Sequence, residues 1–252
     1  MHFSALFLVV ALASASPLVK NAAKPPAFFL AGDSTTATIT TGGGGWGDGF
    51  LETLTNGAIG QNFARNGRTT VDFVTLGYWA NVIAAVKSNK ANYSPYVTIQ
   101  FGHNDQKPEK NISIAEYSTN LKNLANEVIS SGGTPILVSP LSRRSYSSST
   151  GKINENLSNE RTAVLAVASA NKFKVIDLNK NSTAYLNAIG QTNAVKYNLN
   201  PDDNTHLNKA GQTVFGNMVA SLIEGLDAAL DSYINPNQTI LAAIKKGTFI
   251  LP

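Results

Sequence analysis

Two short segments at opposite ends of the chain contain the residue types that nucleophilic catalysis needs. The segment 32–35 (Gly-Asp-Ser-Thr) follows the apolar run 27–31, which places Ser34 at the end of an expected β-strand. Near the other end of the chain, Asp203 lies three residues before His206. At this spacing the carboxylate can reach a ring nitrogen within one loop and fix the imidazole tautomer, as a serine-activating base requires. The spacing predicts Ser34 as nucleophile, His206 as base and Asp203 as the orienting carboxylate.

The scarcity of histidine narrows the choice of base. The chain has three, His2, His103 and His206, and His2 falls in an expected leader. For the carboxylate, Asp202 is the alternative to Asp203, at a spacing of four residues instead of three. A serine after a strand is also common as a turn or helix-capping residue. The assignment of Ser34 as nucleophile therefore depends on the base, carboxylate and oxyanion donors predicted beside it.

Two further loops carry groups that can stabilise a developing oxyanion. Gly67, in the segment 66–68 (Asn-Gly-Arg), exposes an unhindered backbone N–H, although a glycine there also suits a plain turn. Asn104, in the segment 102–105 (Gly-His-Asn-Asp), has a side-chain amide that can donate to an oxyanion or bond its own backbone. Together with the N–H of Ser34, these groups form a predicted oxyanion hole.

These blocks occur in the order typical of the SGNH/GDSL hydrolases, and the chain resembles that superfamily over residues 27–225. The positions that match its four invariant letters are Ser34, Gly67, Asn104 and His206. More narrowly, the segment 32–36, the Gly-rich run 42–47 and the segment 101–105 look like the fungal rhamnogalacturonan acetylesterase family. The resemblance implies removal of acetyl groups from a galacturonate-containing plant polysaccharide, without a cofactor.

Apolar runs alternate with amphipathic stretches along the chain. Buried strands are expected near 27–32, 58–64, 95–101, 134–139 and 173–178. Helices are expected near 46–55, 70–90, 113–131, 155–171 and 207–230. In the helix expected near 113–131, apolar residues recur at steps of three and four, as on one helical face. They are Ile114, Tyr117, Leu121, Leu124, Val128 and Ile129. The alternation predicts a three-layer α/β/α, flavodoxin-like fold with a five-stranded parallel sheet, whose ligand site lies at the carboxyl ends of the strands.

Basic side chains gather in the loops expected at this edge. They are Arg65, Arg68, Lys107, Lys110, Arg143, Arg144 and Lys196, against the fewer acidic residues Asp105, Glu109, Asp202 and Asp203. The surplus predicts a polyanionic substrate, with contacts expected from Arg68, His103, Lys107 and Arg143. Alternatively, these cations solvate loops, or Arg65 and Arg68 form structural ion pairs. Trp46 and Trp79 are aromatic candidates for sugar stacking, but both fall in expected amphipathic helices, which favours core packing.

The first residues of the chain predict export. Residues 1–15 contain an apolar stretch that ends in Ala-Ser-Ala at 13–15, as in a signal peptide. A polar connector at 16–26 then leads to a single hydrolase domain expected over 27–252. N-glycosylation sequons begin at Asn92, Asn111, Asn156, Asn181 and Asn237. We therefore expect a secreted, extracellular protein.

Composition excludes several other classes of site. The 252 residues contain no cysteine, which excludes disulfides, thiolate zinc sites and cysteine nucleophiles. The net charge is +4 and the pI is near 9.2, but the Lys and Arg are not clustered with aromatics as in nucleic-acid binders. No run is long enough to span a membrane, and no metal-ligand spacing occurs. The Gly-rich run 42–47 lies too far past its strand to cradle a dinucleotide, and Thr36 breaks the G-x-S-x-G pattern.

The expected protein is thus a monomeric serine esterase that acts on an acetylated polysaccharide through an acyl-enzyme. The alternatives are an SGNH esterase for acetylxylan or lipid esters, and a non-catalytic carbohydrate-binding protein with the same fold. The tail after Ser232 is expected to pack back on the domain, at a place that the pattern leaves open.

Overall fold

A parallel sheet forms the centre of the computed structural model, which describes residues 1–2 and 24–252. The expected leader, 1–15, and most of the connector lie outside the described residues apart from the first two. The strands are β1 (Pro26–Gly32), β2 (Ile59–Asn62), β3 (Ser94–Gln100), β4 (Thr134–Val138) and β5 (Lys174–Ile176). Their order in the sheet is β2-β1-β3-β4-β5, and all pairs are parallel. The predicted five-stranded α/β sheet is confirmed, with the flavodoxin-like strand order.

The central strand β1 is buried on both faces, which explains its continuous apolar sequence. Successive side chains of a strand point to opposite faces. Phe28 and Leu30 accordingly enter one hydrophobic cluster, whereas Ala27, Phe29 and Ala31 enter the other. β1 pairs on one side with β2 and on the other with β3. The chain reverses its direction of winding here, so the ends of β1 and β3 flank the point where such sheets bind ligands.

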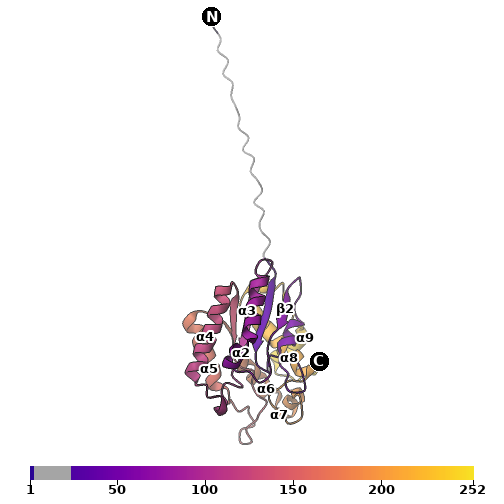
Figure 1. The fold of residues 1–252 in the computed structure, drawn as a ribbon. Coiled ribbons are helices and arrows are strands. Elements are labelled where there is room, and N and C mark those ends of the chain that lie inside the picture. Colours follow the sequence, from indigo (N-terminus) through magenta and orange to yellow (C-terminus); the bar gives the residue numbers. More distant parts are fainter. Residues whose placement is uncertain (3–23) are drawn as a thin grey trace.

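Helices cover both faces of the sheet (Figure 1). They are α1 (Gly47–Leu51), α2 (Thr70–Thr75), α3 (Tyr78–Asn89), α4 (Ile114–Ser131), α5 (Ser158–Asn171), α6 (Leu178–Ile189), α7 (Gln191–Ala194), α8 (Lys209–Glu224) and α9 (Gln238–Lys246). Short 3-10 turns occur at Pro108–Lys110, Val195–Tyr197 and Ala228–Leu230. Helices α3, α4 and α5 pack in one layer, and α1, α6, α8 and α9 pack in the other.

The expected helix 113–131 forms as α4, with local signals at both ends. The Ser113 side chain accepts a hydrogen bond from the Glu116 N–H, and Gly132 ends the helix with φ +95°. Ile114 and Ile129 were placed on the buried face by their spacing, and this was wrong. Their side chains are 46% and 50% exposed. Ile114 is the first residue of the helix, and Ile129 lies at the edge of the stripe that faces the sheet.

The expected helix 70–90 is two helices instead of one. Gly77 adopts φ +80° between α2 and α3, a left-handed conformation that interrupts the helical hydrogen bonds. The expected helix 207–230 forms as the shorter α8. It begins at Lys209, because the Asn208 side chain accepts from the Gly211 N–H and caps the first turn. The chain then leaves the helix after Glu224.

Three helices, α6, α9 and the four-residue α7, escaped the sequence prediction. The sequence of α6 is rich in Asn, Ser and Thr, yet Asp177 caps it and its apolar side chains enter the core. Helix α9 belongs to the tail that follows Ser232. Beyond it, the Tyr197 hydroxyl donates to the Ile250 carbonyl at 2.6 Å. The tail thus packs back, as expected, against the chain that leads into the His206 loop.

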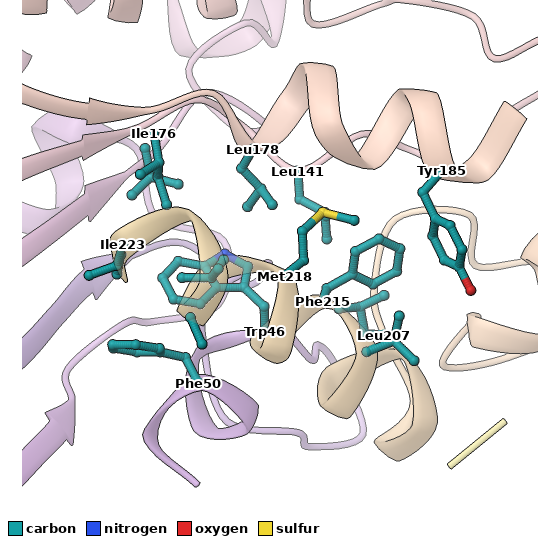
Figure 2. Close-up of a cluster of buried hydrophobic side chains, with 14 of the residues drawn as sticks. Trp46, Phe50, Leu141, Ile176, Leu178, Tyr185, Leu207, Phe215, Met218 and Ile223 are labelled. Atoms are coloured by element: carbon teal, nitrogen blue, oxygen red, sulfur yellow. The ribbon is translucent and has the colours of Figure 1, made fainter. Parts of the chain in front are cut away.

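Both tryptophans lie in the hydrophobic cores, as the amphipathic pattern favoured. Trp46 is fully buried beside Phe50, and α8 adds Phe215 and Met218 to the same cluster (Figure 2). The Trp46 indole donates to Gln100 Oε1 at 2.8 Å. Neither indole lies open to a sugar, since Trp79 is 3% exposed in the other cluster.

Candidate active site

Ser34 lies in a tight turn directly after β1. Gly32 must be glycine because a Cβ there would lie 2.8 Å from the Gln100 carbonyl oxygen of β3. The Asp33 carboxylate accepts from both the backbone N–H and the hydroxyl of Thr35, each at 2.8 Å. These contacts hold the backbone on both sides of Ser34. The serine itself is 5% exposed, so a substrate has access only along a restricted approach.

Ser34, His206 and Asp203 form an unbroken chain of hydrogen bonds. His206 Nε2 lies 2.8 Å from Ser34 Oγ, and His206 Nδ1 lies 2.8 Å from Asp203 Oδ2. The other Asp203 oxygen accepts from the backbone N–H groups of Thr205 and His206, at 3.0 and 2.9 Å. The carboxylate is therefore held in place by its own loop. Asp202, the alternative orienting residue, is exposed.

The pKa of Asp203 is lowered from its ordinary value. Partial burial acts to raise this pKa, but the hydrogen bonds from the His206 backbone and ring and from the Thr205 N–H outweigh it. The carboxylate is therefore ionised at neutral pH. In that state it accepts the Nδ1 proton of His206 and leaves Nε2 free to accept the Ser34 hydroxyl proton.

A buried arginine fixes the loop that carries His206. Arg144 Nε donates to Asn198 Oδ1 at 2.6 Å, and its Nη2 donates to the carbonyl oxygen of His206. The Arg144 backbone N–H also donates to the Asn204 carbonyl at 2.8 Å. Arg144 was expected among the accessible basic side chains at the carboxyl edge of the sheet, and this is corrected: its side chain is 1% exposed. No local pattern distinguishes it from the neighbouring Arg143, so sequence reasoning missed this contact.

Asn104 and Gly67 follow β3 and β2, next to the Ser34 turn. Asn104 is 4% exposed, and its Nδ2 donates to the Arg68 carbonyl at 3.1 Å. An amide nitrogen has two hydrogens, so this bond orients the group and leaves one hydrogen available. Gly67 is exposed and has φ +74°, a conformation that a side chain would strain. The loop of Gly67 is joined to β1, because the Arg65 N–H donates to the Gly32 carbonyl.

His103 does not line the groove, contrary to expectation. It is 2% exposed, and its Nδ1 lies 3.7 Å from Asp33 Oδ2 and 3.4 Å from Thr35 Oγ1. Burial lowers the pKa of His103, and the Asp33 carboxylate only partly offsets this effect. Burial acts to raise the pKa of Asp33, but the nearby His103 ring and the hydrogen bonds from Thr35 lower it on balance. His103, Asp33 and Thr35 thus lie against one another at the turn that carries Ser34.

Three other side chains were expected to contact the substrate, and they differ in whether the protein already uses their hydrogen-bond donors. Arg143 Nε donates to Thr205 Oγ1 at 3.2 Å, and its Nη2 donates to the His103 carbonyl at 3.3 Å, so this guanidinium braces two loops instead of standing free. Lys107 is exposed, and Arg68 is half-buried beside Gly67. These two keep the placement that the sequence predicted.

Asp105 joins the Asn104 loop to the start of α2. Its carboxylate accepts from the Thr70 N–H at 2.8 Å and hydroxyl at 2.6 Å, and from the Gly102 N–H at 3.2 Å. Burial raises the pKa of Asp105 to about 6, although the Thr70 bonds oppose the rise. Asp105 thus positions the loop of Asn104 and does not line the groove.

Among residues 1–2 and 24–252 there is no group of three His, Cys, Asp or Glu side chains arranged to hold a metal ion. Over the same residues, the helices are all too short or too polar to cross a membrane.

Comparison with known proteins assigns the chain to a family. The profile of the GDSL-like Lipase/Acylhydrolase family matches residues 28–219, a stretch that includes Ser34 and His206. The chain belongs to this family. It is a GDSL hydrolase, and its reaction class is the hydrolysis of carboxylic esters. The resemblance to the SGNH/GDSL hydrolases is thereby confirmed, whereas the narrower resemblance to the fungal rhamnogalacturonan acetylesterases stays a prediction.

Individual relatives place this GDSL hydrolase among esterases. It is 28% identical over 226 residues to rhamnogalacturonan acetylesterase RhgT of Bacillus subtilis (strain 168), covering 84% of this chain and 95% of that protein. The crystal structure of Bacillus subtilis protein YxiM has a TM-score of 0.69 at 23% identity, covering 81% of this chain and 57% of that one. The acetylxylan esterase Axe2 of Geobacillus stearothermophilus has a TM-score of 0.58 at 17% identity, covering 81% and 94%. At these identities, the two solved structures establish a shared fold.

Proposed function

We propose that this GDSL hydrolase is a secreted serine esterase that removes acetyl groups from a pectic polysaccharide of the rhamnogalacturonan type. The observation that carries the proposal is the pair of 2.8 Å contacts that join Ser34 Oγ to His206 and His206 to Asp203. A carbohydrate-binding protein would have no need of a serine, base and carboxylate in this arrangement.

In the proposed reaction, Ser34 Oγ attacks the acetyl carbonyl carbon while His206 Nε2 takes the hydroxyl proton. The oxyanion of the tetrahedral intermediate accepts from the N–H groups of Ser34 and Gly67 and from Asn104 Nδ2. When the intermediate collapses, the sugar hydroxyl leaves with the proton from His206, and the acetyl group stays on Ser34. Water then attacks this acyl-enzyme by the same steps, releasing acetate and restoring the serine. Asp203 stabilises the imidazolium in both halves.

Two observations support an acidic polysaccharide as substrate. The relative RhgT is named as a rhamnogalacturonan acetylesterase and matches along most of both chains. In addition, Arg65, Arg68 and Lys107 lie in the loops after β2 and β3, on the side of the sheet where Ser34 lies. A positive groove concentrates a galacturonate-rich chain by electrostatic attraction, which salt screens.

The catalytic assignment is tested with Ser34→Ala and a serine-directed organophosphorus reagent. We expect the variant to lose nearly all turnover of p-nitrophenyl acetate, and mass spectrometry to find the label on Ser34. A label on Ser139 or Ser142 would reject the assignment of the nucleophile. Full activity of Ser34→Ala would reject the serine mechanism.

The substrate assignment is tested by acetate release from acetylated rhamnogalacturonan and from neutral acetylated xylan at increasing ionic strength. We expect kcat/KM for the first substrate to be higher at low salt and to fall as salt is added, while that for xylan stays flat. Equal salt sensitivity, or faster turnover of xylan at low salt, would favour an acetylxylan esterase instead.

Secretion is tested on the protein made in a eukaryotic host. We expect the mature chain to start after Ala15 and to carry N-glycans. The five sequon asparagines are all exposed, but they differ in setting. Asn181 lies inside α6 and donates its Nδ2 to the Asp177 carbonyl, so we expect it to be modified least. Recovery of residues 1–15 from secreted material would contradict the leader.

A further inference from the structure

We propose that Arg65, Arg68 and Tyr78 form a carboxylate-binding subsite beside Ser34, which holds the acid group of a uronate unit in the substrate. The proposal rests on the proposed function in that it takes the substrate to be an acidic polysaccharide. The sequence predicted contacts with an anionic substrate from basic side chains in several loops. The proposal places the binding of the acid group in one cavity.

The cavity lies between the loop that follows Ser34 and the loop that contains Gly67. It has a volume of about 300 Å³, and its walls include Ala37, Thr40 and Asn66. Asn66 Nδ2 donates to Thr40 Oγ1 at 2.9 Å and so joins the two loops. The cavity is therefore built from the same loops that carry the proposed nucleophile and oxyanion donors.

Two guanidinium groups face one aromatic ring at this cavity. The Cζ atoms of Arg65 and Arg68 lie 5.6 and 5.9 Å from the centroid of the Tyr78 ring. Cation–π contacts of this kind hold the guanidinium planes in place. Both cationic side chains line the same cavity, so an anion bound there is attracted by two positive charges.

Neither guanidinium forms an ion pair with a residue that the structure describes. In residues 24–252, the ion pairs involve other cations: Lys110 pairs with Asp72 at 3.0 Å, for example. Within residues 24–252, Arg68 Nε is buried and lacks a hydrogen-bond partner. A buried donor without a partner is costly, and a ligand that accepts from it removes this cost. Arg143 and Arg144 donate to protein carbonyls, although Arg144 Nη1 is also without a partner among these residues.

The hydrogen-bond donors of Arg65 and Arg68 suit a carboxylate ligand. Guanidinium groups present planar, paired N–H donors that match the two oxygens of a carboxylate. Arg68 directly follows Gly67, and its carbonyl accepts from Asn104 Nδ2. A uronate held by this pair would thus lie next to the oxyanion donors. The subsite would bring the acetyl ester of a nearby sugar toward Ser34.

The subsite is tested by inhibition instead of turnover of the polymer. The probe is unacetylated tetragalacturonate, used as a competitive inhibitor of p-nitrophenyl acetate hydrolysis, with the carboxyl-reduced oligosaccharide as neutral counterpart. Variants are Arg65→Gln, Arg68→Gln and the double change. Lys122→Gln, an exposed lysine on α4, is the matched loss of one positive charge.

We expect the Ki of tetragalacturonate to rise about tenfold or more in the double variant, the size expected for losing charge-assisted hydrogen bonds. Lys122→Gln should leave this Ki unchanged, and the neutral oligosaccharide should inhibit weakly throughout. The single variant Arg65→Gln, at an exposed side chain, keeps the test valid if Arg68→Gln unfolds. Equal Ki values in wild type and double variant, or equal inhibition by the neutral oligosaccharide, would overturn the subsite.

The result separates the subsite from the proposed function. If acetate is released from acetylated rhamnogalacturonan but Ki is insensitive to both arginines, the subsite alone is rejected. If Ki depends on the arginines but no acetate is released from that polymer, the subsite stands and the substrate assignment is rejected.

Discussion

Arg144 holds the carbonyl group of His206, the residue whose ring contacts Ser34. The guanidinium is fully buried, and its Nε bonds Asn198 in the segment before the loop. Burial lowers the pKa of Arg144 to about 10, partly offset by the charge of Asp203, so it remains a cation at neutral pH. One side chain therefore sets the position of the base and adds positive charge near its carboxylate.

We predict that Arg144→Lys lowers kcat for p-nitrophenyl acetate by about 10²-fold, with a small change in KM, because a displaced base costs rate at a fixed substrate site. The lysine keeps the charge but cannot contact both Asn198 and His206. Steady-state kinetics and a thermal unfolding curve check this. Wild-type kcat in a folded Arg144→Lys enzyme would show that the loop holds its shape without the guanidinium.

Asn104→Ala should lower kcat by about 10²–10³-fold with little change in KM, as expected when one oxyanion donor is lost. The matched control is Asn126→Ala, an exposed position on α4. A rise in KM at constant kcat would instead indicate that Asn104 binds the ground state.

Asp203→Asn should reduce kcat by about 10²–10⁴-fold, because the amide favours the tautomer with a proton on His206 Nε2, which cannot accept from Ser34. The backbone bonds from Thr205 and His206 can persist to the remaining oxygen, so we expect the fold to survive. Asp202→Asn, at the exposed neighbour, should be nearly silent in the same assay. The reverse order of effects would make Asp202 the orienting residue.

Asp177 predicts a pH-dependent contribution to stability. Burial acts to raise its pKa, but hydrogen bonds from Arg161, Ser139 and Lys180 lower it below the ordinary 3.8. Because the folded-state pKa is depressed, the stabilisation is full above pH 3.8 and is lost as pH falls through the folded value.

Asp177→Asn should therefore lower the free energy of unfolding by about 1–3 kcal/mol at pH 7, and by progressively less below pH 4. Urea unfolding at several pH values measures this difference, with Asp231→Asn at an exposed site as control. A difference that stays constant down to pH 2 would show that the ionised carboxylate is not the source.

The sequence alone was sufficient for the features that depend on local geometry. The contact of Asp203 with His206 follows from a three-residue spacing within one loop. The central strands β1, β3 and β4 followed from apolar runs, since a strand buried on both faces has few polar residues. The stretch 58–64 was expected to be a buried strand, and this was wrong: β2 lies at the edge of the sheet and is largely exposed. Parallel strands end at the same edge of a sheet, so the polar residues after β1 and β3 had to meet there. The missed α6 shows the limit, because its composition is polar and its burial comes from packing against α8.

Only the tertiary structure decided which charges are free and which are used. Arg68, Arg143 and Arg144 look alike in sequence, but Arg144 is buried against the His206 carbonyl and Arg143 donates to the His103 carbonyl. Arg68 instead lies beside Tyr78 without an ion pair among the described residues. The fate of a long cationic side chain depends on which carbonyls and carboxylates the fold brings near it from distant segments. That information is absent from the local pattern and arises when the loops pack together.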